Sequence, residues 1–179
     1  MRLDPATNHT QRHCSALNKN YQLIELKLHI EPIKDKEEIP FDLLELADPS
    51  RFQIESYLNT GLCFIAKFKS EIVGVIVLNE IDSTVIEIKN IAIKESEQGK
   101  GFGKALLKYS EKVSRESGYQ KLIIGTGNSS VGQLALYQKE GFEIDRIEKN
   151  FFLKNYTEPI FENGIQCKHM VILEKKLEK

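Results

Sequence analysis

A glycine-rich turn near the middle of the chain joins a strand-like segment directly to a helical one. In "NIAIKESEQGKGFGKALLKYSEK", residues 90–112, glycines stand at alternating positions, Gly99, Gly101 and Gly103. A helix start leaves its first backbone N–H groups unpaired and carries a partial positive charge, and glycines let an anion approach that backbone closely. Lys100 and Lys104 add positive charge. The turn therefore predicts a phosphate or pyrophosphate ligand rather than a merely tight connection.

Two common phosphate-binding motifs do not fit this turn. The dinucleotide pattern G-x-G-x-x-G, started at Gly99, requires a glycine where the chain has Lys104. The P-loop pattern requires a glycine at Gln98 and a serine or threonine at Ala105, so no hydroxyl is available for magnesium. The anion must be held by a different motif.

Strand and helix patterns alternate around the turn. Asp48-Pro49 is expected to supply the N-cap and first residue of a short helix. Strands are predicted at 26–30, 63–68, 72–78, 85–93, 121–126, about 142–152 and 169–177, and helices within 41–61 and at 102–117 and about 130–140. This order predicts an α+β fold with a mixed sheet.

The composition is that of one globular domain. With 179 residues, 41% of them hydrophobic, residues 21–179 are expected to form a single core. Residues 1–20 are polar and aperiodic and are expected to be a flexible extension. His9, His13 and Cys14 could bind a metal there, but no second ligand cluster completes a site, so no metal is expected.

Charge and hydropathy exclude several classes of partner. The 25 basic and 26 acidic residues include no long basic block, so nucleic acid is not expected as a partner. The longest apolar run, "GVIVL", is far shorter than the ~20 residues of a membrane-spanning helix, and no signal-peptide core is present. Three widely spaced cysteines fit reduced thiols. We expect a soluble, cytoplasmic protein without membrane contact.

In the strand before the turn, the alternation of apolar and polar residues slips by one position. In "VIEIKNIAI", residues 85–93, the isoleucines before Lys89 keep one phase of alternation and those after Asn90 keep the other. A β-bulge near Lys89-Asn90 explains this slip, and bulges occur often beside active sites. The alternative is a strand buried on both faces, which need not alternate at all.

The turn and its setting resemble the GCN5-related N-acetyltransferase (GNAT) family. Gln98 to Gly103 match the family signature Q/R-x-x-G-x-G/A, and "LALYQKEGF" further on adds to the likeness, which covers roughly residues 26–177. The resemblance implies a mostly antiparallel sheet of about six to seven strands, about four flanking helices and a splayed central strand pair. It also implies acetyl-CoA as co-substrate, with its pyrophosphate bound by Gln98, Gly99, Lys100, Gly101, Phe102, Gly103 and Lys104.

The resemblance also implies where the pantetheine arm of acetyl-CoA binds. The family pairs this arm with the strand before the loop, here the main chain of Ile91, Ala92 and Ile93, with a freed N–H near the acetyl carbonyl. Family members usually carry an asparagine seven residues before the catalytic tyrosine, but this chain has Ser130 there and Asn128 two residues earlier. Either Asn128 reaches the pantetheine, or Ser130 takes over both the helix cap and the contact.

Two residues are expected to do the chemistry. Tyr137 matches the family's general acid, which protonates the departing thiolate; the alternative role of a tyrosine on an amphipathic helix is packing. An amine with a pKa of ~10.4 is only about 0.04% neutral at pH 7, which motivates a general base. Glu87, which stands among isoleucines, is the candidate general base. The alternative is that Glu87 only forms an ion pair with Lys89 or with a cross-strand partner.

These inferences predict an acetyl-CoA-dependent N-acetyltransferase that acts by direct transfer, without an acyl-enzyme on Cys63 or Cys167. The acceptor is a small-molecule amine, aminoglycoside-like or polyamine-like, or a peptide. "YTEPIFENGIQCKHM" is similar to bacterial members, some of them labelled aminoglycoside acetyltransferases. The alternatives are a non-catalytic acyl-CoA-binding regulatory module and an enzyme for larger acyl chains.

The acceptor pocket is expected to be acidic and aromatic. In the family it is built from the first helices and the loop before the last strand, here roughly 41–61 and 154–168. The aromatic connection is also expected to support a homodimer, since its rings would otherwise form an apolar patch. The side chains expected to line the pocket include the acidic residues Glu45, Asp48, Glu55, Glu158 and Glu162 and the aromatic residues Phe152, Tyr156 and Phe161, in or beside these segments.

Overall fold

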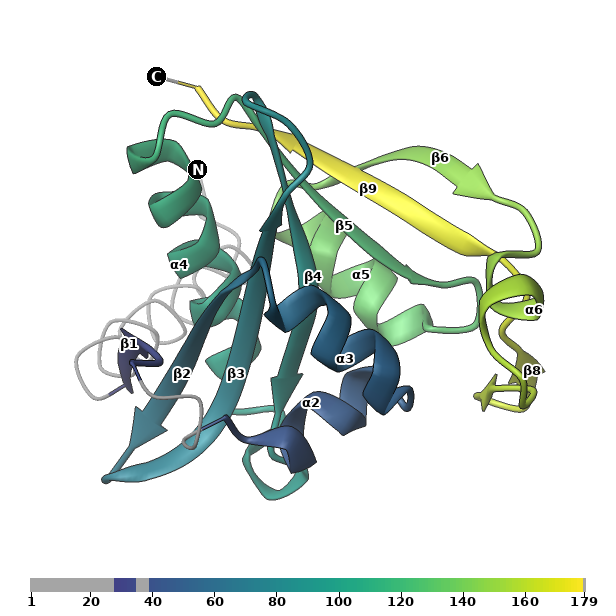
Figure 1. The fold of residues 1–179 in the computed structure, drawn as a ribbon, viewed down its shortest axis with the longest axis horizontal. Helices are drawn as coiled ribbons and strands as arrows, with labels where there is room; N and C mark the ends of the chain where they lie inside the picture. Colours follow the sequence, from purple (N-terminus) through teal and green to yellow (C-terminus); the bar gives the residue numbers. More distant parts are fainter. Residues whose placement is uncertain (1–27, 35–38, 179) are drawn as a thin grey trace, which may run out of the picture.

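A seven-stranded sheet forms the centre of the computed structural model, which describes residues 28–34 and 39–178 (Figure 1). Its strand order is β1-β2-β3-β4-β5-β9-β6, and only the β4–β5 pair is parallel. The α+β prediction, with a mixed and mostly antiparallel sheet, is thereby confirmed. The strands are β1 (Leu28–Pro32), β2 (Leu62–Phe68), β3 (Glu71–Glu80), β4 (Val85–Ile93), β5 (Lys121–Gly127), β6 (Glu143–Glu148) and β9 (Met170–Lys176).

Helices cover both faces of the sheet and divide the core into two layers. The first layer packs α2 (Phe41–Ala47) and α3 (Arg51–Leu58) on one face, around Leu44, Ile54 and Val75. The second packs α4 (Phe102–Glu116) and α5 (Val131–Lys139) on the other, around Ile76, Leu106 and Leu173. The amphipathic pattern after the glycines is therefore satisfied by burial of one helix face. A 3-10 turn (Glu95–Glu97) precedes the glycines.

The cap of α3 differs from the prediction. Ser50, not Asp48, is the N-cap, and its hydroxyl accepts a hydrogen bond from Gln53 N at 3.3 Å. Asp48 instead accepts a bond from Ser50 N at 3.0 Å. The aspartate therefore lies before the helix and stabilises the turn between α2 and α3.

The predicted strand at 142–152 is too long. β6 ends at Glu148, and Asn150 takes a left-handed conformation with φ 62°, which breaks the extended chain before α6 (Phe151–Asn155). The connection that follows contains a small hairpin of β7 (Phe161–Glu162) and β8 (Ile165–Gln166). Its turn is Asn163-Gly164, with φ of 53° and 72°. Asn-Gly is a strong hairpin signal, so this element was readable from the sequence.

A β-bulge and a strand separation lie at the centre of the sheet. In the β3–β4 ladder, Asn90 pairs with Val77 and Ile88 pairs with Leu78, so Lys89 is the extra residue. β4 pairs with β5 only from Val85 to Ile88, after which the two strands diverge. The predicted bulge at Lys89-Asn90 and the splayed central pair are both confirmed.

Asn90 ties this bulge to the first helical layer. Its side chain is 3% exposed, and Nδ2 donates to the backbone oxygen of Leu44 at 3.0 Å and to the hydroxyl of Tyr57 at 2.9 Å. One amide therefore connects β4 with α2 and α3, beside the point where the strands separate.

The predicted extension at residues 1–20, with His9, His13 and Cys14, lies outside the described residues. None of the described helices is both long enough and apolar enough to cross a membrane.

Replacement of Asn90 by alanine should destabilise the fold. The change removes both hydrogen bonds and deprives the Tyr57 hydroxyl of its donor, so the free energy of unfolding should fall by about 1–3 kcal/mol. Urea denaturation monitored by circular dichroism measures this loss. Asn59→Ala, at an exposed site after α3, is the control and should shift stability by less than about 0.5 kcal/mol. Equal midpoints for the two variants would contradict the role of Asn90.

Candidate active site

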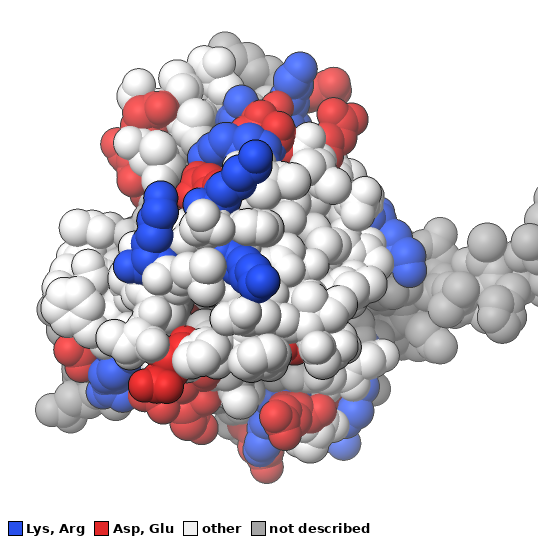
Figure 2. All heavy atoms as spheres, turned by 90° about the vertical axis from the view of Figure 1, so that its right-hand side faces the viewer, with Lys and Arg blue, Asp and Glu red and all other residues white. Residues whose placement is uncertain are grey.

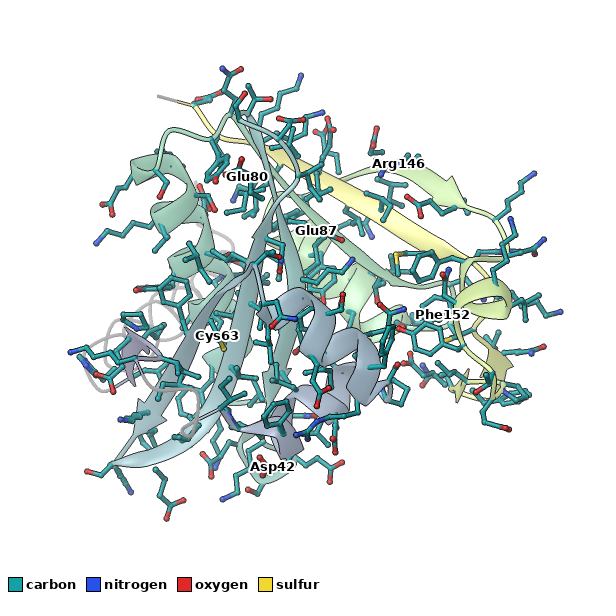
Figure 3. All side chains as sticks on the ribbon, viewed as in Figure 1. Asp42, Cys63, Glu80, Glu87, Arg146 and Phe152 are labelled. Carbon is teal, nitrogen blue, oxygen red and sulfur yellow. The ribbon has the colours of Figure 1, made fainter. Side chains whose placement is uncertain are left out.

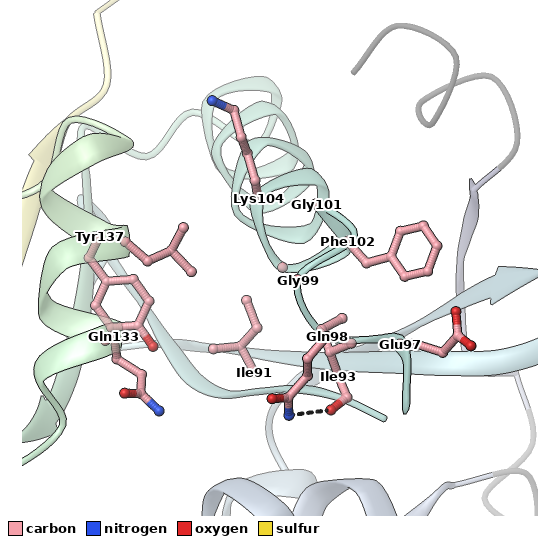
Figure 4. A pocket seen from close by; sticks show the side chains of 13 residues that line it. Ile91, Ile93, Glu97, Gln98, Gly99, Gly101, Phe102, Lys104, Gln133 and Tyr137 are labelled. Atoms are coloured by element: carbon pink, nitrogen blue, oxygen red, sulfur yellow. Dashed lines mark hydrogen bonds between the residues drawn. The ribbon is translucent and has the colours of Figure 1, made fainter. Parts of the chain in front are cut away.

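A groove of about 540 Å³ runs between the end of β4, the glycine turn and α5 (Figure 4). It is lined on one side by Ile91 and Ile93, and on the other by Gln133 and Tyr137. The predicted residues Gln98, Gly99, Gly101, Phe102, Gly103 and Lys104 all line the same groove. Lys100 of the predicted loop is absent from this lining.

The glycine turn leaves backbone donors unpaired at the groove. Gly99 and Gly101 have φ of 74° and 89°, a conformation that suits glycine, and Gly101 is the N-cap of α4. The first backbone bond of the helix runs from Ala105 N to Gly101 O at 3.1 Å. Among the described residues, the N–H groups of Phe102 and Gly103 therefore have no intrahelical acceptor, which is the arrangement that binds anions.

The two lysines of the turn are held in ion pairs. Lys100 Nζ lies 2.9 Å from Glu97, and Lys104 Nζ lies 2.7 Å from Glu140. These carboxylates offset much of the positive charge that the sequence suggests. The backbone N–H groups and the α4 dipole are thus the main attraction for an anion at this turn.

The main chain of β4 faces the opening beside the groove. Lys94 N donates to Val73 O at 2.9 Å, so by strand alternation the polar groups of Ala92 face β3 while those of Ile91 and Ile93 face the gap. Ile93 O already accepts a bond from Gln98 Nε2 at 3.1 Å (Figure 4). The Ala92 side chain is buried in the first helical layer, away from the groove.

A second cavity of about 370 Å³ lies on the α2–α3 side of the same gap. It shares Ile91, Gln133 and Tyr137 with the groove, so the two spaces meet at these side chains. Figure 3 shows two parts of its wall, Glu87 on β4 and Phe152 on α6. The remaining lining comes mainly from the α2–α3 turn, the far half of β5 and the segment before β9.

Tyr137 stands at the junction of the two cavities. Its side chain is 5% exposed and packs against Phe142, with ring centroids 6.2 Å apart. Burial, and then the charge of Glu162, raise the pKa of Tyr137 above its ordinary value. The phenol therefore keeps its proton at neutral pH, as a proton donor must. Packing and proton donation are compatible here, because the ring is buried while the residue lines both cavities.

Glu87 lines the second cavity and also forms an ion pair. Lys89 Nζ lies 3.3 Å from its Oε2, and the Glu87 side chain is 12% exposed. The ion-pair alternative is therefore present in the structure. The role of Glu87 as a base stays a prediction.

Asn128 and Ser130 hold the segment before β9. Asn128 Nδ2 donates to Gln166 O at 3.2 Å, and its Oδ1 accepts bonds from Lys168 N at 2.7 Å and His169 N at 2.8 Å. Ser130 is the N-cap residue of α5, as one of the two alternatives had it, but its side chain makes no capping hydrogen bond. A cofactor contact by either residue stays a prediction, and neither lines the groove.

Ser130 connects α5 to the β7–β8 hairpin. Its hydroxyl donates to Glu162 Oε2 at 2.5 Å, and both residues line the second cavity.

Sequence reasoning missed the groove residues Gly132, Gln133 and Leu136. Helical spacing could have found Gln133, which lies four residues before Tyr137 and so on the same face of α5.

Cys63 is poorly suited to nucleophilic attack. Burial raises the pKa of the Cys63 thiol to about 12, so it stays protonated. Cys167 lies 2.6 Å from the Ser129 hydroxyl in the wall of the second cavity. Among the described residues, no group of three or more histidine, cysteine or acidic side chains could hold a metal ion.

Comparisons with known proteins agree on one family. The model of the acetyltransferase (GNAT) family matches residues 25–142. The uncharacterized N-acetyltransferase YvbK of Bacillus subtilis is 48% identical over 147 residues, covering 82% of this chain and 95% of that protein.

Two solved structures give the same result. A GNAT family acetyltransferase from Elizabethkingia anophelis, with acetyl-CoA bound, is 50% identical, with a TM-score of 0.83 over 84% of this chain and 99% of that one. A Bacillus subtilis acetyltransferase in complex with CoA is 47% identical, with a TM-score of 0.80 over 85% and 100% of the two chains.

The glycines of the turn should respond differently to alanine. Gly101→Ala places a Cβ on a residue with φ 89° and should lower the free energy of unfolding by about 1–2 kcal/mol. Gly103 lies inside α4, and an added Cβ would meet Leu136 at an ordinary 3.8 Å, so Gly103→Ala should retain or raise stability. Urea denaturation of the two variants measures the difference. A loss for Gly103→Ala that matches the loss for Gly101→Ala would show that the turn is not set by backbone conformation.

Proposed function

The chain belongs to the GNAT family of acetyltransferases, with acetyl-CoA as its co-substrate, and we propose that it transfers the acetyl group directly to a primary amine. The amine is carried by a small molecule or by a peptide. The observation that carries this proposal is the junction of two cavities at Tyr137. One cavity suits a pyrophosphate-bearing donor, and the other leaves room for an acceptor on the opposite side of the gap.

The groove suits acetyl-CoA in its donors and in its open space. The N–H groups at the start of α4 can donate hydrogen bonds directly to the oxygens of a pyrophosphate. A Cβ built on Gly99 or on Gly132 would meet no atom within 4 Å, so the surface there is open to a ligand. The polar main-chain groups of Ile91 and Ile93 face the gap and can pair with the amides of the pantetheine arm.

The proposed reaction assigns one role to each side of the gap. The neutral amine attacks the acetyl carbonyl from the second cavity, and a main-chain N–H of β4 stabilises the developing oxyanion. Glu87, or a water molecule that it orients, takes the proton from the amine. Tyr137 gives its proton to the departing thiolate, because a thiol leaves more easily than its anion.

A non-catalytic acyl-CoA-binding module is the second candidate function. A sensor needs the groove alone, whereas this chain also has a second cavity that meets the groove at a protonated tyrosine. An enzyme for larger acyl chains would keep the same groove and differ only in the space at the junction.

Thiol release tests the proposal. An enzyme should liberate free CoA from acetyl-CoA in proportion to an added amine, in a panel of polyamines, aminoglycosides, aryl amines and peptides. A module that binds acetyl-CoA in calorimetry but releases no thiol with any amine would instead be a sensor. Propionyl-CoA and butyryl-CoA in the same assay distinguish the acyl chain.

Replacement of Tyr137 by phenylalanine should separate catalysis from binding. The variant keeps the ring packing against Phe142 and removes only the hydroxyl. The affinity for acetyl-CoA and the thermal stability should stay close to wild type, while kcat falls by roughly 10² or more. Thiol release measures kcat, and calorimetry measures affinity. An unchanged rate between pH 6 and 9 would make Tyr137 a packing residue.

A homodimer is part of the same proposal. Phe152 and Tyr156 are half-buried in the second cavity, so they do not form the apolar patch that the sequence suggested. Leu153, Phe161 and Ile165 of this connection are exposed instead, at 51%, 63% and 50%. Figure 2 shows this end of the molecule, where uncharged surface covers most of the middle and a few basic side chains cross it. Exposed apolar side chains gathered in one connection are typical of a contact surface.

Light scattering at tens of micromolar should therefore give the mass of a dimer, and Phe161→Asp should shift it toward the monomer. A monomeric peak for the unmodified chain at these concentrations would contradict the dimer.

A cytoplasmic location is proposed on a separate ground, because both described cysteines, Cys63 and Cys167, are free thiols, as expected in a reducing compartment.

A further inference from the structure

We propose that Asp48 determines acceptor specificity by binding a second, non-reacting cationic group of the amine substrate. The preferred acceptors are then diamines or polyamines, with one amine at the junction of the cavities and another positive charge at the α2–α3 turn. This inference rests on the proposed function for the fate of the first amine. Recognition of the second charge depends only on the second cavity.

The Asp48 carboxylate is positioned with one oxygen held and the other free. Oδ1 accepts two hydrogen bonds, from Ser50 N at 3.0 Å and from the Tyr156 hydroxyl at 3.1 Å. Within the described part of the chain, no hydrogen bond reaches Oδ2. Asp48 and Tyr156 both line the second cavity. The carboxylate is therefore fixed by its neighbours and still has an acceptor oxygen for a ligand.

Aromatic rings lie beside this carboxylate. Tyr156 stacks on Phe152 with ring centroids 5.5 Å apart, and Phe152 meets Phe151 edge to face at 5.3 Å. All three rings line the second cavity. A free carboxylate oxygen in a cavity that aromatic rings also line can bind an ammonium group, through an ion pair with the oxygen and cation–π contacts with a ring.

Among the described residues, no basic side chain forms an ion pair with Asp48. Burial raises the pKa of the Asp48 carboxyl, against the lowering effect of its hydrogen bonds and of Lys89. Of the described residues that line the second cavity, Lys89 is the one with a basic side chain, and it is already paired with Glu87 at 3.3 Å. Partly buried charges are stabilised by an opposite charge, so a ligand cation would supply what the described residues do not.

The other carboxylates of the cavity point to two separate positions for positive charge. Glu45 is paired with Arg51 at 3.1 Å, whereas the one described partner of the Glu162 carboxylate is the hydroxyl of Ser130. The charge of Glu162 acts on Tyr137 at the junction, where the reacting amine must lie. Asp48 lies instead on the α2–α3 side of the gap. An acceptor that satisfies both carboxylates carries two cationic groups.

The test compares α,ω-diamines of three to eight carbon atoms with n-alkyl monoamines of the same lengths. In the unmodified protein, kcat/KM for the best diamine should exceed that of its matched monoamine at least tenfold. In Asp48→Asn this preference should fall at least tenfold, because KM for the diamine rises. The asparagine keeps Oδ1 as acceptor for Ser50 and Tyr156, so the turn retains its bonds.

Asp42→Asn is the matched control. It removes a carboxylate from the exposed start of α2, the helix that ends just before Asp48, and it lies far from Phe152 (Figure 3). It should leave the preference for diamines unchanged. Equal rates for diamines and monoamines in the unmodified protein, or a preference that survives in Asp48→Asn, would overturn the role of Asp48. A loss of preference in Asp42→Asn as large as that in Asp48→Asn would also overturn it.

Calorimetry on the CoA-saturated protein separates this inference from the proposed function. If no amine releases thiol, but a diamine binds and Asp48→Asn weakens that binding at least tenfold, the enzyme proposal fails and the recognition by Asp48 stands. If thiol is released while the diamine binds equally to Asp48→Asn, the enzyme proposal stands and the recognition fails. Absence of diamine binding to the unmodified protein overturns the recognition as well.

Discussion

The separation of β4 from β5 is the constraint on which the site depends. The extra residue Lys89 lets Ile86 and Ile88, before the bulge, and Ile91 and Ile93, after it, face the same helical layer, so the core is continuous on both sides of the slip. Pairing with β5 ends at Ile88. A gap opens in the middle of the sheet, where backbone polar groups would otherwise be satisfied by a neighbouring strand. Both cavities meet at this gap.

The donor side of the gap is built from backbone and is therefore readable from local sequence. Gly101 must take a left-handed conformation to start α4, and the helix then presents N–H groups whatever the neighbouring side chains are. The spacing of the glycines was enough to predict an anion site. Its electrostatics were not predicted, because Glu140 reaches Lys104 from α5, 36 residues further along the chain.

The acceptor side is built from side chains that are far apart in the sequence. The bond between Asp48 and Tyr156 spans 108 residues, and no local period or turn signal predicts such a contact. Asn128 illustrates the same difficulty. A family pattern suggested a cofactor contact, yet its amide is occupied by three bonds to the segment 166–169. By contrast, the Asn163-Gly164 hairpin was signalled locally and overlooked.

This division explains how one scaffold can accept different amines. The groove, the gap and Tyr137 depend on strand pairing and helix packing, which tolerate little change. Specificity instead depends on the α2–α3 turn and the α6–β8 connection, whose residues contact each other but contribute little to the two main core clusters. Under the proposed role of Asp48, substitutions there should alter which cation is bound without disturbing the β3–β4 ladder. Because Tyr156 belongs to the connection and donates to Asp48 in the turn, a change in the connection removes one of the two hydrogen bonds on Oδ1 and leaves only the bond from Ser50 N.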